Sequence, residues 1–141
     1  MSCMLRASGV NFDVTSFLEN CELEPVSVQL KGEPQFPKSQ PNGPFFERSG
    51  VNFEASPADF SELSIQMQDT AKFLREHEEL ISRLKAFPGV ENLTLDFGAE
   101  IHPPGWCSFH FPSNLLLSIG ALGISLGLSV YPVEEENEHS T

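Results

Sequence analysis

The clearest hydrophobic pattern lies between residues 73 and 98, where a helical period gives way to an alternating one. The first part repeats at steps of three and four, which places its members on one face of an α-helix: Phe73, His77, Leu80, Ile81, Leu84 and Phe87. Pro88 and Gly89 then end the helix. Beyond them Leu93, Leu95 and Phe97 alternate with polar residues, as in a strand with one buried face. The pattern predicts a helix that folds back onto a sheet.

Similar patterns predict the elements on either side. Further strands are expected at residues 3–8, 26–30, 51–55, 106–111 and 124–130. A short helix follows Asp13 or Thr15, either of which can cap it. Another is opened by Pro112 and Ser113 and closed by Gly123.

A long helical pattern leads into the central stretch. Ser56, Pro57 and Asp59 offer a capping hydroxyl, a proline for the first helical position and a carboxylate for the first turn, so a helix is predicted from Pro57. The pattern continues to residue 87, which is long for one helix of a globular protein. A break is therefore expected between residues 75 and 78.

Residues 31–50 follow neither period and are predicted to form a long loop, because prolines and glycines interrupt them throughout. Loops of this length are often binding segments. Phe36, Phe45 and Phe46 are candidate binding residues, as exposed aromatic anchors for a partner. The alternative is that these rings fold back and hold the loop against the core.

Two hexapeptides echo one another at residues 8–13 and 49–54, reading Ser-Gly-Val-Asn-Phe followed by an acidic residue. The echo either marks two related strand-helix-strand halves or is a coincidence at similar turns. It gives weak support to a pseudo-repeated split fold.

Composition then sets the class of protein. A chain of 141 residues is long enough for one domain with its own core, expected at 1–133, followed by an acidic, disordered tail at 134–141. Three scattered cysteines and no visible secretory signal point to a reducing, cytoplasmic setting. The net charge of −12 disfavours nucleic acid and anionic membranes and permits a basic protein partner.

The uncharged span at 114–133 raises the question of a membrane helix. It is rich in glycine and serine, has no flanking Lys or Arg, and changes period at Gly123. A helix followed by a strand is the better interpretation.

Few residues suggest chemistry. His102, Cys107 and His110 form the one cluster of soft ligands, but a Cys-x-x-His pair on a strand points to opposite faces, so no metal and no cofactor is expected. Asp96 is a candidate binding residue because it lies mid-strand, opposite core positions. Ser113 lacks the glycines of a hydrolase elbow, and no catalytic residue is predicted.

Several short segments together resemble a family of short bacterial proteins of unknown function. They are Ser8-Gly9-Val10-Asn11-Phe12-Asp13-Val14, Lys31-Gly32-Glu33-Pro34, Phe87-Pro88-Gly89-Val90, Leu95-Asp96-Phe97-Gly98, Phe111-Pro112 and Ser129-Val130-Tyr131-Pro132. These segments are turns and strand ends, so the resemblance implies a fold better than an activity. Some small acidic bacterial domains of this kind neutralise toxins as immunity proteins, which is an analogy at the level of the fold.

Together these patterns predict an α+β protein, with a mostly antiparallel sheet of five or six strands, helices on one face and a ferredoxin-like split strand-helix-strand core. The leading hypothesis is a non-enzymatic, cytoplasmic domain that binds a basic protein. The alternative is a ligand-binding domain or small enzyme with its site near the 31–50 loop, Asp96 and His110. A third is a homodimer through the face of Ser125, Gly127 and Ser129; monomer and homodimer both remain open.

Overall fold

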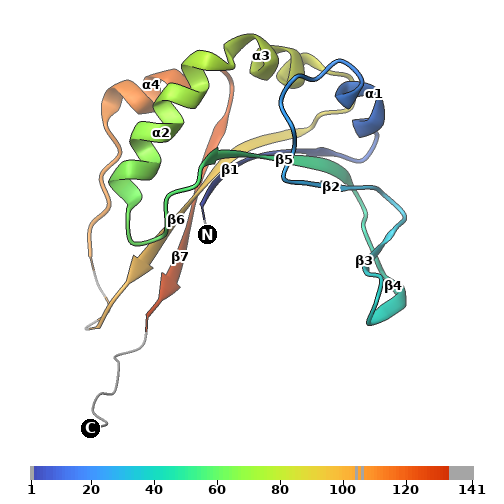
Figure 1. Cartoon of the computed structure of the whole chain (residues 1–141), viewed down its shortest axis with the longest axis horizontal. Coiled ribbons are helices and arrows are strands. Elements are labelled where there is room, and N and C mark those ends of the chain that lie inside the picture. The colour runs from blue at the N-terminus through green and yellow to red at the C-terminus, as the bar shows by residue number, and fades with distance from the viewer. Residues whose placement is uncertain (1, 104, 106, 134–141) are drawn as a thin grey trace, which may run out of the picture.

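A five-stranded mixed sheet, covered on one face by helices, is the centre of the computed structural model (Figure 1). The structure describes residues 2–103, 105 and 107–133. In these residues the strands are β1 (Cys3–Gly9), β2 (Ser27–Gln29), β3 (Pro34–Phe36), β4 (Gln40–Phe45), β5 (Ser49–Ser56), β6 (Asn92–Ile101) and β7 (Ser125–Pro132). The helices are α1 (Val14–Leu18), α2 (Leu63–Glu76), α3 (Glu78–Ala86) and α4 (Ser113–Ala121). The predicted α+β class is confirmed; the proposed tail at 134–141 lies outside the described residues.

The strand order in the large sheet is β2-β5-β1-β6-β7. The first three pairings are antiparallel, and β7 runs parallel to β6. β1 therefore lies between β5 and β6, which are joined through α2 and α3, and β5 lies between β1 and β2, which are joined through α1.

Alternation of apolar and polar residues decides which face of each strand is buried. Leu5 of β1, Phe53 of β5 and Leu95 of β6 are fully buried beneath the helices. Arg6, Asn52 and Thr94, one position along, face the other side of the sheet, where β1, β5 and β6 place them in adjacent register. The helices contribute their apolar stripes to the same core, including Ile81 and Leu84 of α3 and Ile119 of α4.

The predicted helix starts are confirmed for α1 and α4 and wrong for α2. Asp13 caps α1 as expected, accepting hydrogen bonds from the Ser16 backbone N–H at 3.1 Å and the Ser16 hydroxyl at 2.8 Å. α4 begins at Ser113. The helix predicted from Pro57 begins instead at Leu63, because the Ser56 hydroxyl accepts from the Ala58 N–H in a local turn. The expected break falls at His77, between α2 and α3.

Residues 31–50 are not the long irregular loop that the prolines suggested. Residues 34–45 form the β3–β4 hairpin, in which Pro34 pairs with Phe45 and Phe36 with Gln40, and Ser49 and Gly50 already belong to β5. Figure 1 shows this hairpin projecting beyond β2, away from the helical layer. Prolines fit here because both strands of the hairpin are edges and a missing N–H is tolerated there.

The echoed hexapeptides do not mark two equivalent halves. The first runs from the end of β1 through a turn to the Asp13 cap, whereas the second lies wholly in β5. The two meet in space, since Ser8 pairs with Gly50 and Gly9 with Ser49 across the antiparallel ladder.

The strand predicted at 106–111 is absent from residues 107–111, which have no regular structure; Trp106 lies outside the described residues. Phe111 packs edge-on against the buried ring of Phe97, at 5.2 Å between centroids, which joins the end of this segment to the core.

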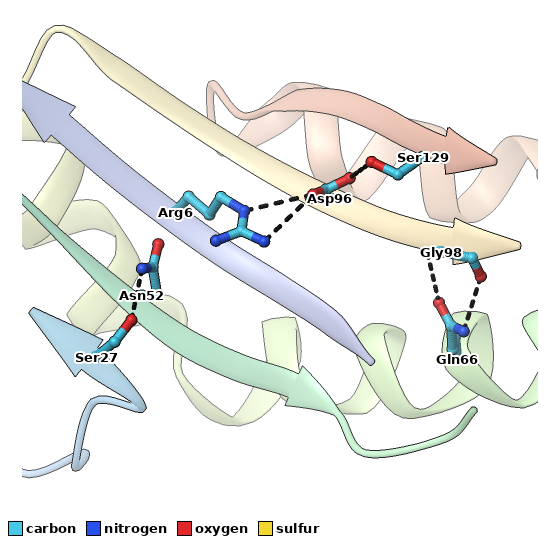
Figure 2. A network of polar contacts seen from close by, with 7 residues as sticks. All are labelled: Arg6, Ser27, Asn52, Gln66, Asp96, Gly98 and Ser129. Atoms are coloured by element: carbon cyan, nitrogen blue, oxygen red, sulfur yellow. Dashed lines mark hydrogen bonds and ion pairs between the residues drawn. The ribbon is translucent and has the colours of Figure 1, made fainter. Parts of the chain in front are cut away.

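Gln66 of α2 completes the sheet where β1 stops short. Its side chain is fully buried, donates to the Gly98 carbonyl at 2.9 Å and accepts from the Gly98 N–H at 3.1 Å (Figure 2). Since Met4 pairs with Asp96, Gly98 lies just beyond the last rung of the β1–β6 ladder. The amide of Gln66 takes the place of the next strand residue.

In the described part of the chain, no helix combines the length and the apolar character needed to cross a membrane.

Candidate functional site

The face of the sheet opposite the helices carries a small polar network. The Asp96 carboxylate accepts from the Arg6 guanidinium at 3.4 Å and from the Ser129 hydroxyl at 2.9 Å, so it joins β1, β6 and β7 (Figure 2). Asn52 donates to the Ser27 hydroxyl at 2.7 Å on the same face. Asp96 is only partly exposed, but Arg6 is about half exposed, so the ion pair contributes little to stability. Both oxygens of Asp96 are therefore engaged in contacts within the chain.

One end of this face is covered by an aromatic stack. Phe60, from the turn before α2, lies parallel to Tyr131 of β7 with 4.4 Å between ring centroids. A side chain at Gly98 would collide with the Phe60 ring, so the absence of a side chain there makes room for the stack.

The β3–β4 hairpin displays aromatic residues to solvent. Phe36 is 52% exposed and Phe45 is 46% exposed. Phe46 is half-buried, and its backbone pairs with Gly32 and Glu33 to close the base of the hairpin. Of the two alternatives for these rings, exposure describes Phe36 and Phe45, and partial burial describes Phe46.

An acidic cavity lies where the α1–β2 connection meets the junction of α2 and α3. Its volume is about 570 Å³, within the range of ligand pockets. The lining side chains are Glu22, Leu23, Arg75, Glu76, His77, Glu78, Glu79, Leu80 and Arg83. Four glutamates face two arginines here, which leaves the cavity negative.

Existing contacts hold the Arg83 side chain in place. The guanidinium donates to the Asn20 carbonyl at 2.7 Å and lies 5.2 Å above the centroid of the Phe17 ring. The His77 ring is similarly held, 4.7 Å from that of Phe73. Glu78 and Glu79 occupy the first turn of α3, where the helix dipole favours carboxylates. Glu76 pairs with Lys72 at 3.9 Å, an exposed and weak contact. Within the described residues, the side chains of Glu22, Glu78 and Glu79 make no hydrogen bond or ion pair and can meet an incoming cation.

A second cavity, of about 400 Å³, lies between α2 and α4. It is lined by Ser64, Met67, Gln68, Ala71 and Arg75 of α2 and by His110, Pro112, Asn114, Leu115 and Ser118. Its lining contains no carboxylate.

The structure does not bring together the residues predicted to share a site. Asp96 lies on the open face of the sheet, His110 lies in the cavity between helices, and the Phe36 and Phe45 side chains lie on the projecting hairpin. Among the described residues, no group of three or more histidine, cysteine, aspartate or glutamate side chains is placed to hold a metal ion.

The surroundings shift the pKa of one thiol, Cys3, and of two carboxyl groups, Asp13 and Glu91. Burial raises the pKa of Cys3 to about 12, so this thiol stays protonated and unreactive at neutral pH. Hydrogen bonds from the Val10 N–H and from Arg48 lower the pKa of the exposed Glu91. Glu91 thereby ties the end of β1 to the segment that precedes β5.

The sequence analysis missed the four glutamates of the acidic cavity. Glu76, Glu78 and Glu79 were visible as helix-surface charges around the expected break, but nothing local showed that Glu22 would lie opposite them. Comparisons with protein-family models, with curated proteins and with solved structures find no match. The proposals below therefore rest on the geometry of this chain.

Proposed function

We propose that the protein is a non-enzymatic binding domain that captures a basic protein through its acidic cavity. The observation on which this rests is the convergence of four glutamates on one hollow, Glu22, Glu76, Glu78 and Glu79. They outnumber its two arginines, Arg75 and Arg83, and Arg83 is already held by other contacts. A Lys or Arg side chain of the partner would enter this hollow and meet several carboxylates at once. The net charge of −12 supports the same partner, since it steers cations toward the molecule from a distance.

The first test is capture of partners from the host lysate on the tagged protein, at about 0.05 M and about 0.5 M salt, where Coulomb attraction is weakly and strongly screened. We expect a basic protein that is retained at low salt and released at high salt. Light scattering of the purified chain gives the stoichiometry and distinguishes monomer from homodimer. If nothing is retained at low salt, the proposal is wrong.

The cavity itself is tested by a triple variant, Glu76→Gln with Glu78→Gln and Glu79→Gln. It should weaken binding at least tenfold and reduce the salt dependence, because it removes three of the four carboxylates. The matched control, Glu19→Gln with Glu54→Gln and Glu62→Gln, makes the same charge change at exposed positions outside both the cavity and the hairpin. Equal loss in both variants would show that only overall charge matters.

The hairpin is a second candidate contact, because Phe36 and Phe45 are large apolar rings held in solvent on an ordered element. The double variant Phe36→Ala with Phe45→Ala should speed dissociation and leave the salt dependence unchanged. Leu117→Ala, which truncates a 73% exposed residue on α4, is the control. If the double variant dissociates at the same rate as the parent chain, the hairpin is not part of the interface.

A toxin is one basic partner that such a domain could neutralise, and on this proposal the chain is an immunity protein of the bacterial family that it resembles. The captured protein should then arrest growth when it is expressed alone, and co-expression of this chain should restore growth. Three free cysteines support a reducing, cytoplasmic setting for that encounter.

We also infer that the core is ferredoxin-like. The order β2-β5-β1-β6 supports this, because the connections β1–α1–β2 and β5–α2–α3–β6 each span one intervening strand. The β3–β4 hairpin is then an insertion between the two units, and α4 with β7 is an addition at the edge.

A further inference from the structure

The cavity between α2 and α4 differs in chemistry from the rest of this acidic protein. The five α2 residues in its lining, at positions 64, 67, 68, 71 and 75, recur at helical spacing and so form one stripe facing α4. The stripe covers about three turns, or roughly 16 Å at ~1.5 Å per residue. The cavity is therefore an elongated groove between two helices.

The groove has an apolar floor. Met67 and Leu115 are 9% and 4% exposed and belong to the hydrophobic core, and the partly buried Ala71 packs against that core. An alkyl chain or ring laid on this floor would displace water from apolar surface, which is favourable by about 25 cal/mol per Å².

The rim carries donors that have no partner. Within residues 2–103, 105 and 107–133, no hydrogen bond or ion pair is made by the side chains of four lining residues: Ser64, Gln68, Arg75 and His110. Arg75 is the one permanently charged residue in the lining. Because the acidic cavity has four glutamates and this groove has none, the two sites favour ligands of opposite charge.

We propose that the groove between α2 and α4 binds an amphipathic monocarboxylate, with its apolar part on Met67, Ala71 and Leu115 and its carboxylate at Arg75. The proposed ligand is the ionised, unesterified carboxylate. Its lining differs from that of the surface proposed to bind a basic protein, and Arg75 is the one residue common to the two cavities.

Octanoate is the probe, titrated into the full chain and followed by amide chemical shifts and by calorimetry. We expect saturable shifts confined to residues 64–75 and 110–118. Octan-1-ol and octylammonium, which have the same chain length without the negative charge, should bind at least tenfold more weakly. Absence of saturable shifts in these residues would overturn the proposal.

Two variants of α2 isolate the charge. Arg75→Gln should lower octanoate affinity about tenfold and leave octan-1-ol binding unchanged. Lys72→Gln removes a cation one turn earlier that pairs with Glu76 and borders neither cavity, so it should bind octanoate like the parent chain. If all three probes bind with equal affinity, or if the two variants change octanoate affinity equally, the proposal is wrong. The groove is then a non-specific apolar surface.

The octanoate titration and the lysate capture fail independently. The capture test uses a protein partner and no fatty acid, and the octanoate test needs no protein partner. The triple variant changes Glu76, Glu78 and Glu79, none of which lines the groove.

Discussion

At the residue scale, the side chain of Gln66 makes the hydrogen bonds to β6 that a neighbouring strand would otherwise make. Its amide makes two hydrogen bonds to Gly98 and a third to the Asp59 carbonyl at 2.9 Å, all from a fully buried position. The turn before α2 and the far end of β6 are thereby joined through a single residue. A buried glutamine with every bond satisfied is compatible with stability, whereas its partners would be left unsatisfied without it.

We predict that Gln66→Leu lowers the free energy of unfolding by about 2–4 kcal/mol, because the side chain keeps its size but the N–H and C=O of Gly98 lose their partner in a buried place. Chemical denaturation measures the change. Gln68→Leu, at an exposed position of the same helix, should stay within about 0.5 kcal/mol of the parent. Similar effects of the two substitutions would mean that Gln66 does not complete the sheet.

At the element scale, β1 ends in direct backbone contact with the turn that leads into β6. The Glu91 N–H donates to the Ser8 carbonyl at 2.9 Å, and a side chain at Gly9 would overlap the carbonyl of Gly89. Gly89 itself has φ of 91°, a conformation that residues with a side chain rarely adopt. The close approach of these two glycines fixes how α3 returns the chain to the sheet.

Two Gly→Ala substitutions should therefore have opposite signs. Gly9→Ala should destabilise the fold by more than about 2 kcal/mol, since backbone must move to admit the new methyl group. Gly120→Ala, in the exposed last turn of α4 with open space around it, should stabilise by up to about 0.5–1 kcal/mol. Thermal unfolding of the two variants measures both changes in stability. A Gly9→Ala variant as stable as the parent chain would refute the close contact between Gly9 and Gly89.

At the scale of the whole molecule, twenty acidic residues against eight basic ones impose self-repulsion on the folded state. The ion pairs of Arg6, Arg48 and Lys72 offset little of this repulsion. In each pair at least one of the two side chains is about half exposed or more, so water screens the attraction. Compactness is therefore maintained against charge by the hydrophobic core.

Added salt should accordingly stabilise the protein. Raising NaCl from about 0.01 M to about 0.15 M shortens the Debye length from roughly 30 Å to 8 Å and screens the repulsion. We expect the melting temperature to rise over this interval, and to rise less in the Glu76, Glu78 and Glu79 triple variant, which carries three fewer negative charges. A melting temperature that falls on adding salt would show that attractive pairs outweigh the repulsion.

Local periodicity accounts for the parts of the fold that sequence reasoning predicted. Leu93, Leu95 and Phe97 alternate because one face of β6 is buried, and the break near His77 follows from the length of the helical pattern. The 31–50 segment was mistaken for a loop because proline is a poor strand residue in general, whereas both strands of this hairpin are edges. The hydroxyl of Ser56 does accept a backbone N–H, that of Ala58, but the bond closes a local turn and α2 starts only at Leu63.

The candidate sites were less accessible to sequence reasoning. His110 and Phe36 could be picked out as residue types, yet nothing local showed that they lie in different places. Glu22 and Glu76 belong to one cavity only because the α1–β2 connection and the α2–α3 junction meet in space.

By itself the sequence determined the α+β class, the identity of most strands and helices, the acidic charge and the buried face of each central strand, because these depend on residues a few positions apart. The tertiary structure alone decided the strand order, the exposure of Phe36 and Phe45, the acidic cavity and the groove between α2 and α4. Those features are made by residues far apart in the chain, and their proximity depends on how the strands pair and where the helices pack.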